Sequence, residues 1–149
     1  GSYYVLAGNW SWDVTWLSLV FALGPTTVLF GKHTDKLEAD RAKGVNTLPV
    51  ILGEKLSRQC VLAMIGAQYL LCILLVLAGS FSWALLLVLF SARSWPRLQA
   101  VFSQPKPERP PAGYPEDIWP LWFSALAFRH TRQFTTLFLT GVVLDTLLH

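Results

Sequence analysis

The sequence predicts an all-α membrane protein, a transmembrane helical bundle of about four spans with one additional interfacial helix. Three observations support this fold class. Only 14% of the 149 residues are charged and 53% are hydrophobic, whereas a soluble domain carries about 25% charged residues. The apolar residues gather in four stretches that approach the about 20 residues a helix needs to cross a bilayer. All twelve Lys and Arg residues fall in a few short regions, as they do in membrane proteins.

The first two apolar stretches are the clearest membrane spans. Residues 14–30 read VTWLSLVFALGPTTVLF, in which the internal Gly-Pro pair is expected to kink a helix. Residues 60–78 contain no charged side chain. Gln68 and Tyr69 lie in the middle of this second stretch. Because polar groups are costly to expose to lipid, both side chains are expected to face the interior of the bundle.

The other two stretches are less regular. The third runs from residue 81 to about residue 101 and takes Arg93 and Arg97 into its last turns. The fourth covers residues 134–148 and is short for a complete span unless the preceding polar residues extend it. Residues 118–128 contain two Trp side chains, which favour the boundary between lipid and water. This segment is therefore predicted to form an interfacial helix, with a half-span as the alternative.

The basic residues orient these spans. All of the Lys and Arg residues lie within residues 32–58, 93–109 or 129–132. Spans connected in order place these three regions on one side of the membrane. The positive-inside rule identifies that side as the cytoplasm. His130, between two arginines, is expected to belong to a cytoplasmic anchor.

Two cytoplasmic loops follow from this topology within a single transmembrane unit, residues 1–149. The first, residues 31–58, holds the densest run of charged residues and is here termed the motif segment. The second, residues 103–117, is rich in proline and is expected to be extended. The net charge of +3 is too small for a nucleic-acid groove, so no nucleic acid is expected as a partner.

The motif segment carries the residues that indicate chemistry. Asp35, Glu38 and Asp40 lie close together in the sequence. They offer the oxygen ligands that Mg²⁺ accepts, usually one or two carboxylates together with substrate phosphates. The same phosphates can be held by three neighbouring cations, Lys36, Arg41 and Lys43. A diphosphate bridged by Mg²⁺ therefore suits this mixture of charges better than a bare metal site does.

Helix geometry limits how these carboxylates can meet. On a continuing helix Asp35 and Glu38 share a face, whereas Asp40 points about 140° away from Asp35. The three converge only if the helix ends or bends before Asp40, and Gly44 is a suitable place for a helix to stop. The alternative is that these charges only anchor the helix at the membrane surface, with Lys36 and Asp40 as an i,i+4 pair.

The sequence KLEADRAKGVNTLPVILGE in the motif segment resembles the second acidic motif of the UbiA-type intramembrane prenyltransferase superfamily. In that motif an acidic stretch at the cytoplasmic end of a transmembrane helix runs into D-R-x-x-G-x-x-T-L-(A/P)-V-x-L-G. The resemblance covers roughly residues 3–56. The residues that fall on the pattern, in order and at fixed spacing, are Asp40, Arg41, Gly44, Thr47, Leu48, Val50, Leu52 and Gly53.

The resemblance implies half of a nine-span helical bundle in which two acidic motifs face one another and bridge Mg²⁺ to a prenyl diphosphate. Such an enzyme transfers the prenyl group to a lipophilic acceptor, commonly an aromatic ring, within the membrane. With the charge pattern, it implies catalytic roles for Asp35 and Asp40. The implied Mg²⁺ ligands are Asp35, Glu38 and Asp40, and the implied diphosphate-binding residues are Lys36, Arg41 and Lys43.

Two departures from the family pattern are present. The usual motif places another aspartate four positions before Asp40. This chain has Lys36 at that position, and the nearby acid is Asp35. The first acidic motif, N-D-x-x-D, does not occur in these 149 residues. The chain is therefore expected to be the C-terminal half of such an enzyme. It is expected to need the missing N-terminal half as a partner, and not to turn over substrate alone.

A non-catalytic function is the alternative hypothesis. In that case the chain is a four-span membrane subunit or scaffold whose charged loop binds a partner protein or anionic lipid. A second acidic motif in the natural polypeptide would distinguish the enzyme from the scaffold. Membrane lipid is an expected partner under both hypotheses.

Overall fold

The computed structural model describes residues 1–148, and every regular element in that part of the chain is helical. Two helices of the described part are long and apolar enough to cross a bilayer. The predicted fold class, an all-α bundle with membrane-spanning helices, is confirmed, and four spans remain a prediction. The elements are α1 (Ser2–Ala7), α2 (Trp12–Asp35), α3 (Leu37–Ala42), α4 (Leu48–Leu52), α5 (Glu54–Leu77), the 3₁₀ helix η1 (Trp83–Ser94), α6 (Trp95–Phe102) and α7 (Phe123–Leu148).

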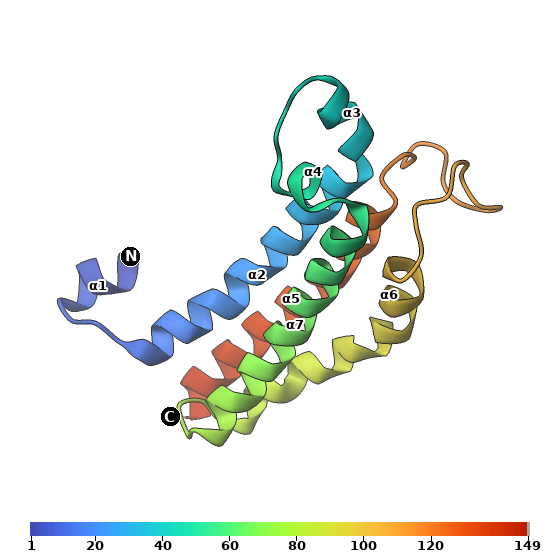
Figure 1. Ribbon diagram of the computed structural model, residues 1–149. Helices are drawn as coiled ribbons and strands as arrows, with labels where there is room; N and C mark the ends of the chain where they lie inside the picture. The colour runs from blue at the N-terminus through green and yellow to red at the C-terminus, as the bar shows by residue number, and fades with distance from the viewer. Residues whose placement is uncertain (149) are drawn as a thin grey trace.

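The bundle is formed by α2, α5, η1 and α7, which lie side by side in Figure 1. Helix α2 packs against both α5 and α7, and η1 packs mainly on α7. The two candidate membrane helices are α2 and α5. The buried apolar residues form two clusters. One is centred on Val20, Cys72, Leu85 and Phe134, and the other on Ile65, Leu98, Phe102 and Phe123.

The third apolar stretch is helical as predicted, but it consists of two different helices. Residues Trp83–Ser94 form a 3₁₀ helix, and the α-helix α6 continues from Trp95 in a new direction (Figure 1). Pro96 lies in the first turn of α6, where a missing backbone N–H is tolerated. Two serine hydroxyls, Ser91 and Ser94, donate to the carbonyl oxygens three residues before them at 2.6 and 2.8 Å.

The predicted interfacial helix at residues 118–128 is wrong. Residues 118–122 form turns and a bend, and α7 begins at Phe123 and continues without a break to Leu148. Pro120 contributes no backbone N–H to a helix, which favours a start after it. The fourth helix is therefore much longer than the apolar stretch at residues 134–148 indicates.

A polar network joins three helices inside the bundle. The Tyr69 hydroxyl lies 2.8 Å from Ser91 Oγ of η1 and 2.8 Å from His130 Nε2 of α7. Gln68 directly precedes Tyr69, and its Nε2 donates to the Val20 carbonyl oxygen at 3.0 Å. The predicted inward orientation of Gln68 and Tyr69 is confirmed. His130 is only 1% exposed, so its predicted role in a cytoplasmic anchor is wrong: the early start of α7 places it inside the bundle, where it contacts Tyr69 of α5.

Candidate functional site

The motif segment is mostly helical. Helix α2 continues to Asp35, and α3 and α4 follow it before α5 begins at Glu54. Lys36 separates α2 from α3 with φ −106° and ψ 12°, which are not helical values. Gly44 follows α3 with a positive φ of 68°, a conformation that glycine adopts without steric cost. The predicted helix stop at Gly44 is therefore confirmed.

Asp35 is the last residue of α2, and its carboxylate caps the N-terminus of α7. Asp35 Oδ1 accepts from the Phe123 backbone N–H at 2.9 Å. Asp35 Oδ2 accepts from the Ser124 backbone N–H at 2.9 Å and from Ser124 Oγ at 2.7 Å. The Asp35 side chain has 0% exposure. The first N–H groups of a helix have no partner within the helix, and a carboxylate there also interacts favourably with the helix dipole.

The close approach of α2 and α7 at this point depends on Gly31. A Cβ atom at Gly31 would lie 3.0 Å from the Ser124 Cα and backbone nitrogen and 3.1 Å from the Phe123 carbonyl carbon. Those contacts are tighter than normal, and the atoms are backbone atoms that cannot rotate away. A glycine one turn before Asp35 therefore lets the start of α7 come within hydrogen-bonding distance of the Asp35 carboxylate.

Lys106, from the connection between α6 and α7, also contacts Asp35. Its Nζ donates to the Asp35 carbonyl oxygen at 3.0 Å and lies 3.9 Å from Asp35 Oδ1. The Lys106 backbone N–H donates to Glu54 Oε1 at 3.0 Å. Burial lowers the pKa of Lys106, and the nearby charges of Asp35 and Glu54 act in the opposite direction. Asp35, Glu54, Lys106 and Ser124 are termed the Asp35 cluster.

Asp40 lies in a different environment on α3. Its Oδ2 is 3.0 Å from His33 Nδ1 in the last turn of α2. The side chain of Asp40 remains 17% exposed and that of His33 32% exposed. The i,i+4 contact of Asp40 with Lys36 is not formed as an ion pair in the described part of the chain. Asp40 is thus held by one partner and keeps access to solvent.

The remaining predicted site residues lie on the surface. Glu38 and Arg41 pair with each other at 2.9 Å, and both side chains are exposed. Lys36 and Lys43 are exposed, and within residues 1–148 neither makes an ion pair. These side chains are therefore available to a ligand, although they are not fixed before it binds.

The structure does not bring the three predicted metal ligands together. No group of three His, Cys, Asp or Glu residues in the described part of the chain could hold a metal ion. Asp35 precedes the helix break at Lys36, and its carboxylate faces α7. Glu38 and Asp40 follow the break on α3, so Asp35 is separated from them. One or two carboxylates suffice for Mg²⁺ when substrate phosphates complete its ligand set. Asp40 fits such a role, and Asp35 fits it only if its bonds to α7 are broken.

Several residues of this region are not recognisable from the sequence. Ser124 and Lys106 contact Asp35 across large distances in the chain, and no local pattern marks them. One signal was present: the acid that the family pattern places at position 36 is displaced to Asp35. A displacement of one residue rotates a helical side chain by about 100°, which agrees with Lys36 being exposed and Asp35 buried.

Comparison with known proteins identifies the family. The family model described as the UbiA prenyltransferase family matches residues 1–126 of the 149. A search of curated proteins and a search of solved structures each found no match to the chain. The matched residues include the whole motif segment, the Asp35 cluster, and most of the bundle. The chain belongs to the UbiA prenyltransferase family, whose members are membrane-embedded enzymes that transfer prenyl groups.

Proposed function

We propose that this chain supplies one of two acidic motifs for the Mg²⁺-dependent transfer of a prenyl group from a prenyl diphosphate to a lipophilic acceptor within the membrane. The observation that carries the proposal is the set of charges around α3. A partly exposed carboxylate, Asp40, lies among three exposed cations, Lys36, Arg41 and Lys43. The facing motif, N-D-x-x-D in this family, comes from polypeptide outside these 149 residues.

Each side chain of the motif has a distinct role in this proposal. Asp40 is the carboxylate ligand of Mg²⁺, and His33 orients it. Glu38 holds the Arg41 guanidinium in place, 2.9 Å away, and is a second carboxylate for the metal once Arg41 turns to the substrate. Lys36, Arg41 and Lys43 bind the oxygen atoms of the diphosphate, where charge-assisted hydrogen bonds are strong. Asp35 is a positioning residue, because its carboxylate is already bonded to α7.

These roles suit the chemistry of the reaction. Departure of a diphosphate from a prenyl group leaves negative charge on the diphosphate, and Mg²⁺ supplies the Lewis acidity that such a leaving group needs. Cationic side chains that contact the developing charge lower the barrier further. The apolar surfaces of the neighbouring helices exclude water, which would otherwise react with the prenyl carbocation.

We place the motif segment on the cytoplasmic side of a multi-pass bundle. Two observations support this orientation. The Lys and Arg residues gather in and near the motif segment, the α6–α7 connection and the early part of α7. In Figure 1, α3, α4 and the α6–α7 connection lie at one end of the bundle, and the turn between α5 and η1 lies at the other end.

The test compares Asp40→Asn with the unchanged sequence, both in the complete natural protein in its native membrane. Asp40→Asn is expected to lower Mg²⁺-dependent release of diphosphate from farnesyl diphosphate about a hundredfold, as losing one charged ligand or donor commonly does. Glu108→Gln, at an exposed acid of the α6–α7 connection, is the matched control and should retain activity. Unchanged activity in Asp40→Asn would contradict the assignment. If the unchanged protein neither binds nor cleaves farnesyl diphosphate, the non-catalytic alternative is favoured.

A further inference from the structure

Two pockets lined by arginines lie between the η1–α6 pair and α7. Their volumes are about 580 and 360 Å³. Arg93 lines the first pocket, Arg97 and Arg129 line the second, and Arg132 lines both. The two pockets are together termed the arginine groove. Neither pocket has an Asp or Glu among its lining residues.

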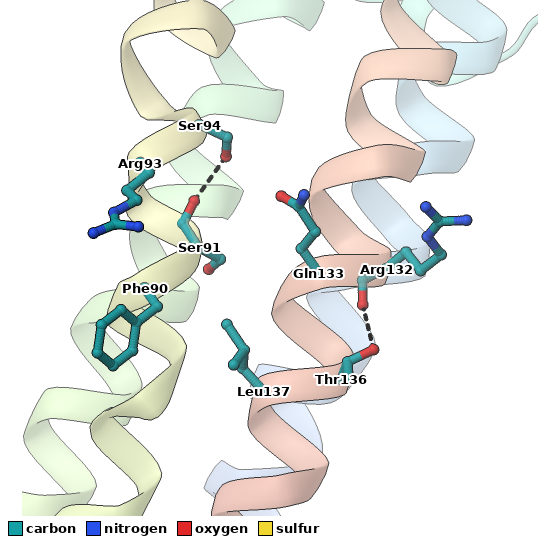
Figure 2. Close-up of a pocket in the computed structure, with 8 residues that line it drawn as sticks. All are labelled: Phe90, Ser91, Arg93, Ser94, Arg132, Gln133, Thr136 and Leu137. Carbon is teal, nitrogen blue, oxygen red and sulfur yellow. Dashed lines mark hydrogen bonds between the residues drawn. The ribbon is translucent and has the colours of Figure 1, made fainter.

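The four guanidinium groups and the side-chain amide of Gln133 are polar groups of this groove that remain available to a ligand. All four arginines are exposed, and none of them pairs with a carboxylate within residues 1–148. The hydroxyls of the larger pocket are already used: Ser94 Oγ donates to the Ser91 carbonyl oxygen at 2.8 Å and Thr136 Oγ1 to the Arg132 carbonyl oxygen at 2.9 Å. Figure 2 shows these bonds, with the Arg93 and Arg132 side chains extending away from each other on the outer sides of η1 and α7.

Both pockets combine arginines with apolar side chains. The first includes Phe90 and Leu137. The second includes Leu126 and Phe128, together with Trp122, whose ring centroid lies 5.2 Å from that of Tyr114. Cationic groups beside apolar and aromatic side chains are typical of the boundary between acyl chains and head groups. An amphipathic anion therefore fits this lining.

We propose that the arginine groove binds an anionic phospholipid through its phosphate group. Basic pockets between membrane helices on the cytoplasmic side are a known form of such sites. A phosphodiester needs only guanidinium donors, whereas a prenyl diphosphate carries more charge and is commonly held with Mg²⁺. The groove has no lining carboxylate that could hold a metal ion, so a phospholipid fits it better than the prenyl diphosphate does. This site is separate from the one proposed at Asp40.

Native mass spectrometry of the full-length, detergent-solubilised protein tests the proposal. Dioleoylphosphatidylglycerol and dioleoylphosphatidylcholine are the anionic and zwitterionic probes. One molecule of the anionic lipid is expected to remain bound under conditions in which the zwitterionic lipid dissociates. The double variant Arg129→Gln/Arg132→Gln should bind the anionic lipid about 25-fold more weakly, about fivefold for each charge removed.

Two further variants separate a specific site from general charge attraction. Lys55→Gln/Arg109→Gln removes the same number of charges from exposed positions outside the groove and should leave lipid binding unchanged. Arg129→Lys/Arg132→Lys keeps the charges and should retain most of the binding. The proposal is overturned if both lipids bind equally, or if both charge-removing variants lose the same affinity. It is also overturned if farnesyl diphosphate with Mg²⁺, or inorganic phosphate alone, displaces the lipid.

Discussion

Asp35 and Asp40 belong to one short acidic stretch, yet they have opposite surroundings. The Asp35 carboxylate has 0% exposure and accepts three hydrogen bonds from Phe123 and Ser124. The Asp40 carboxylate is partly exposed and has one side-chain partner, His33. A buried carboxylate must have its hydrogen bonds satisfied by the protein, whereas an exposed one can exchange water for a ligand. The first therefore belongs to the structure of the bundle, and the second is available for chemistry.

The largest expected effect that tests this comparison is the loss of stability in Asp35→Ala. The change leaves two N–H groups of α7 without partners and removes one of the two charged neighbours of Lys106. Breaking a buried charged contact by removing one partner costs about 3–5 kcal/mol. Asp40→Ala removes a single, partly exposed contact and should cost less than about 1 kcal/mol. Thermal unfolding in detergent measures both, and equal stability of the two variants would refute the assigned roles.

Gly31→Ala should have the next largest effect. The added Cβ would lie about 3.0 Å from backbone atoms of Ser124, so α7 must shift, at a cost of about 1–3 kcal/mol. Gly66→Ala is the matched control, because the nearest atom to its added Cβ, on the Trp95 ring, is 3.9 Å away. Alanine is favoured over glycine within a helix, so this variant should be at least as stable as the unchanged protein. Denaturation curves of the two variants distinguish the loss of the close contact between Gly31 and Ser124 from the general effect of replacing glycine in a helix.

Lys106 is expected to make the free energy of unfolding depend on pH. Burial lowers its pKa in the folded protein from the usual 10.5, so the unfolded chain holds the proton to higher pH. The unfolded state then binds more protons in the alkaline range below 10.5, and the free energy of unfolding should rise with pH there. Lys106→Met should remove this rise. A series of unfolding measurements across that range gives the slope, and an unchanged slope in the variant would show that another group titrates.

The smallest expected effect on stability is at the exposed pair of Glu38 and Arg41. Arg41→Gln should change the free energy of unfolding by less than about 0.5 kcal/mol, as is usual for a surface ion pair. The same variant should weaken binding of farnesyl diphosphate with Mg²⁺, measured by calorimetry. Normal diphosphate binding would remove Arg41 from the proposed site without affecting the comparison of Asp35 with Asp40.

Local sequence signals predicted the features that depend on neighbouring residues. The apolar stretches predicted three of the four long helical segments to within six residues at each end. Gly44 predicted the end of α3, and the polar pair at Gln68 and Tyr69 predicted the inward face of α5. These features follow from hydropathy, backbone freedom and the cost of exposing polar groups to lipid, all of which act over short ranges.

Features that depend on distant residues were not predicted. The cap formed by Asp35 joins residues that lie 88 and 89 positions apart, and it sets the start of α7 well before the fourth apolar stretch. His130 is buried for the same reason, although its neighbours in the sequence are arginines. The geometry of the candidate site was not predicted, since the direction of Asp35 depends on where α7 begins.

The Tyr69 hydroxyl has a consequence for motion within the bundle. In a bilayer, apolar helix faces can slide along each other at little cost, because lipid is as apolar as the faces themselves. A slip of one residue moves a helix by about 1.5 Å, which is enough to break contacts of 2.8 Å from Tyr69 to Ser91 and His130. The Tyr69 hydroxyl therefore favours one alignment of α5, η1 and α7 along their axes. Gln68 links α5 to α2 in the same way, through its bond to the Val20 carbonyl oxygen, so sliding any of these helices past α5 breaks a polar contact.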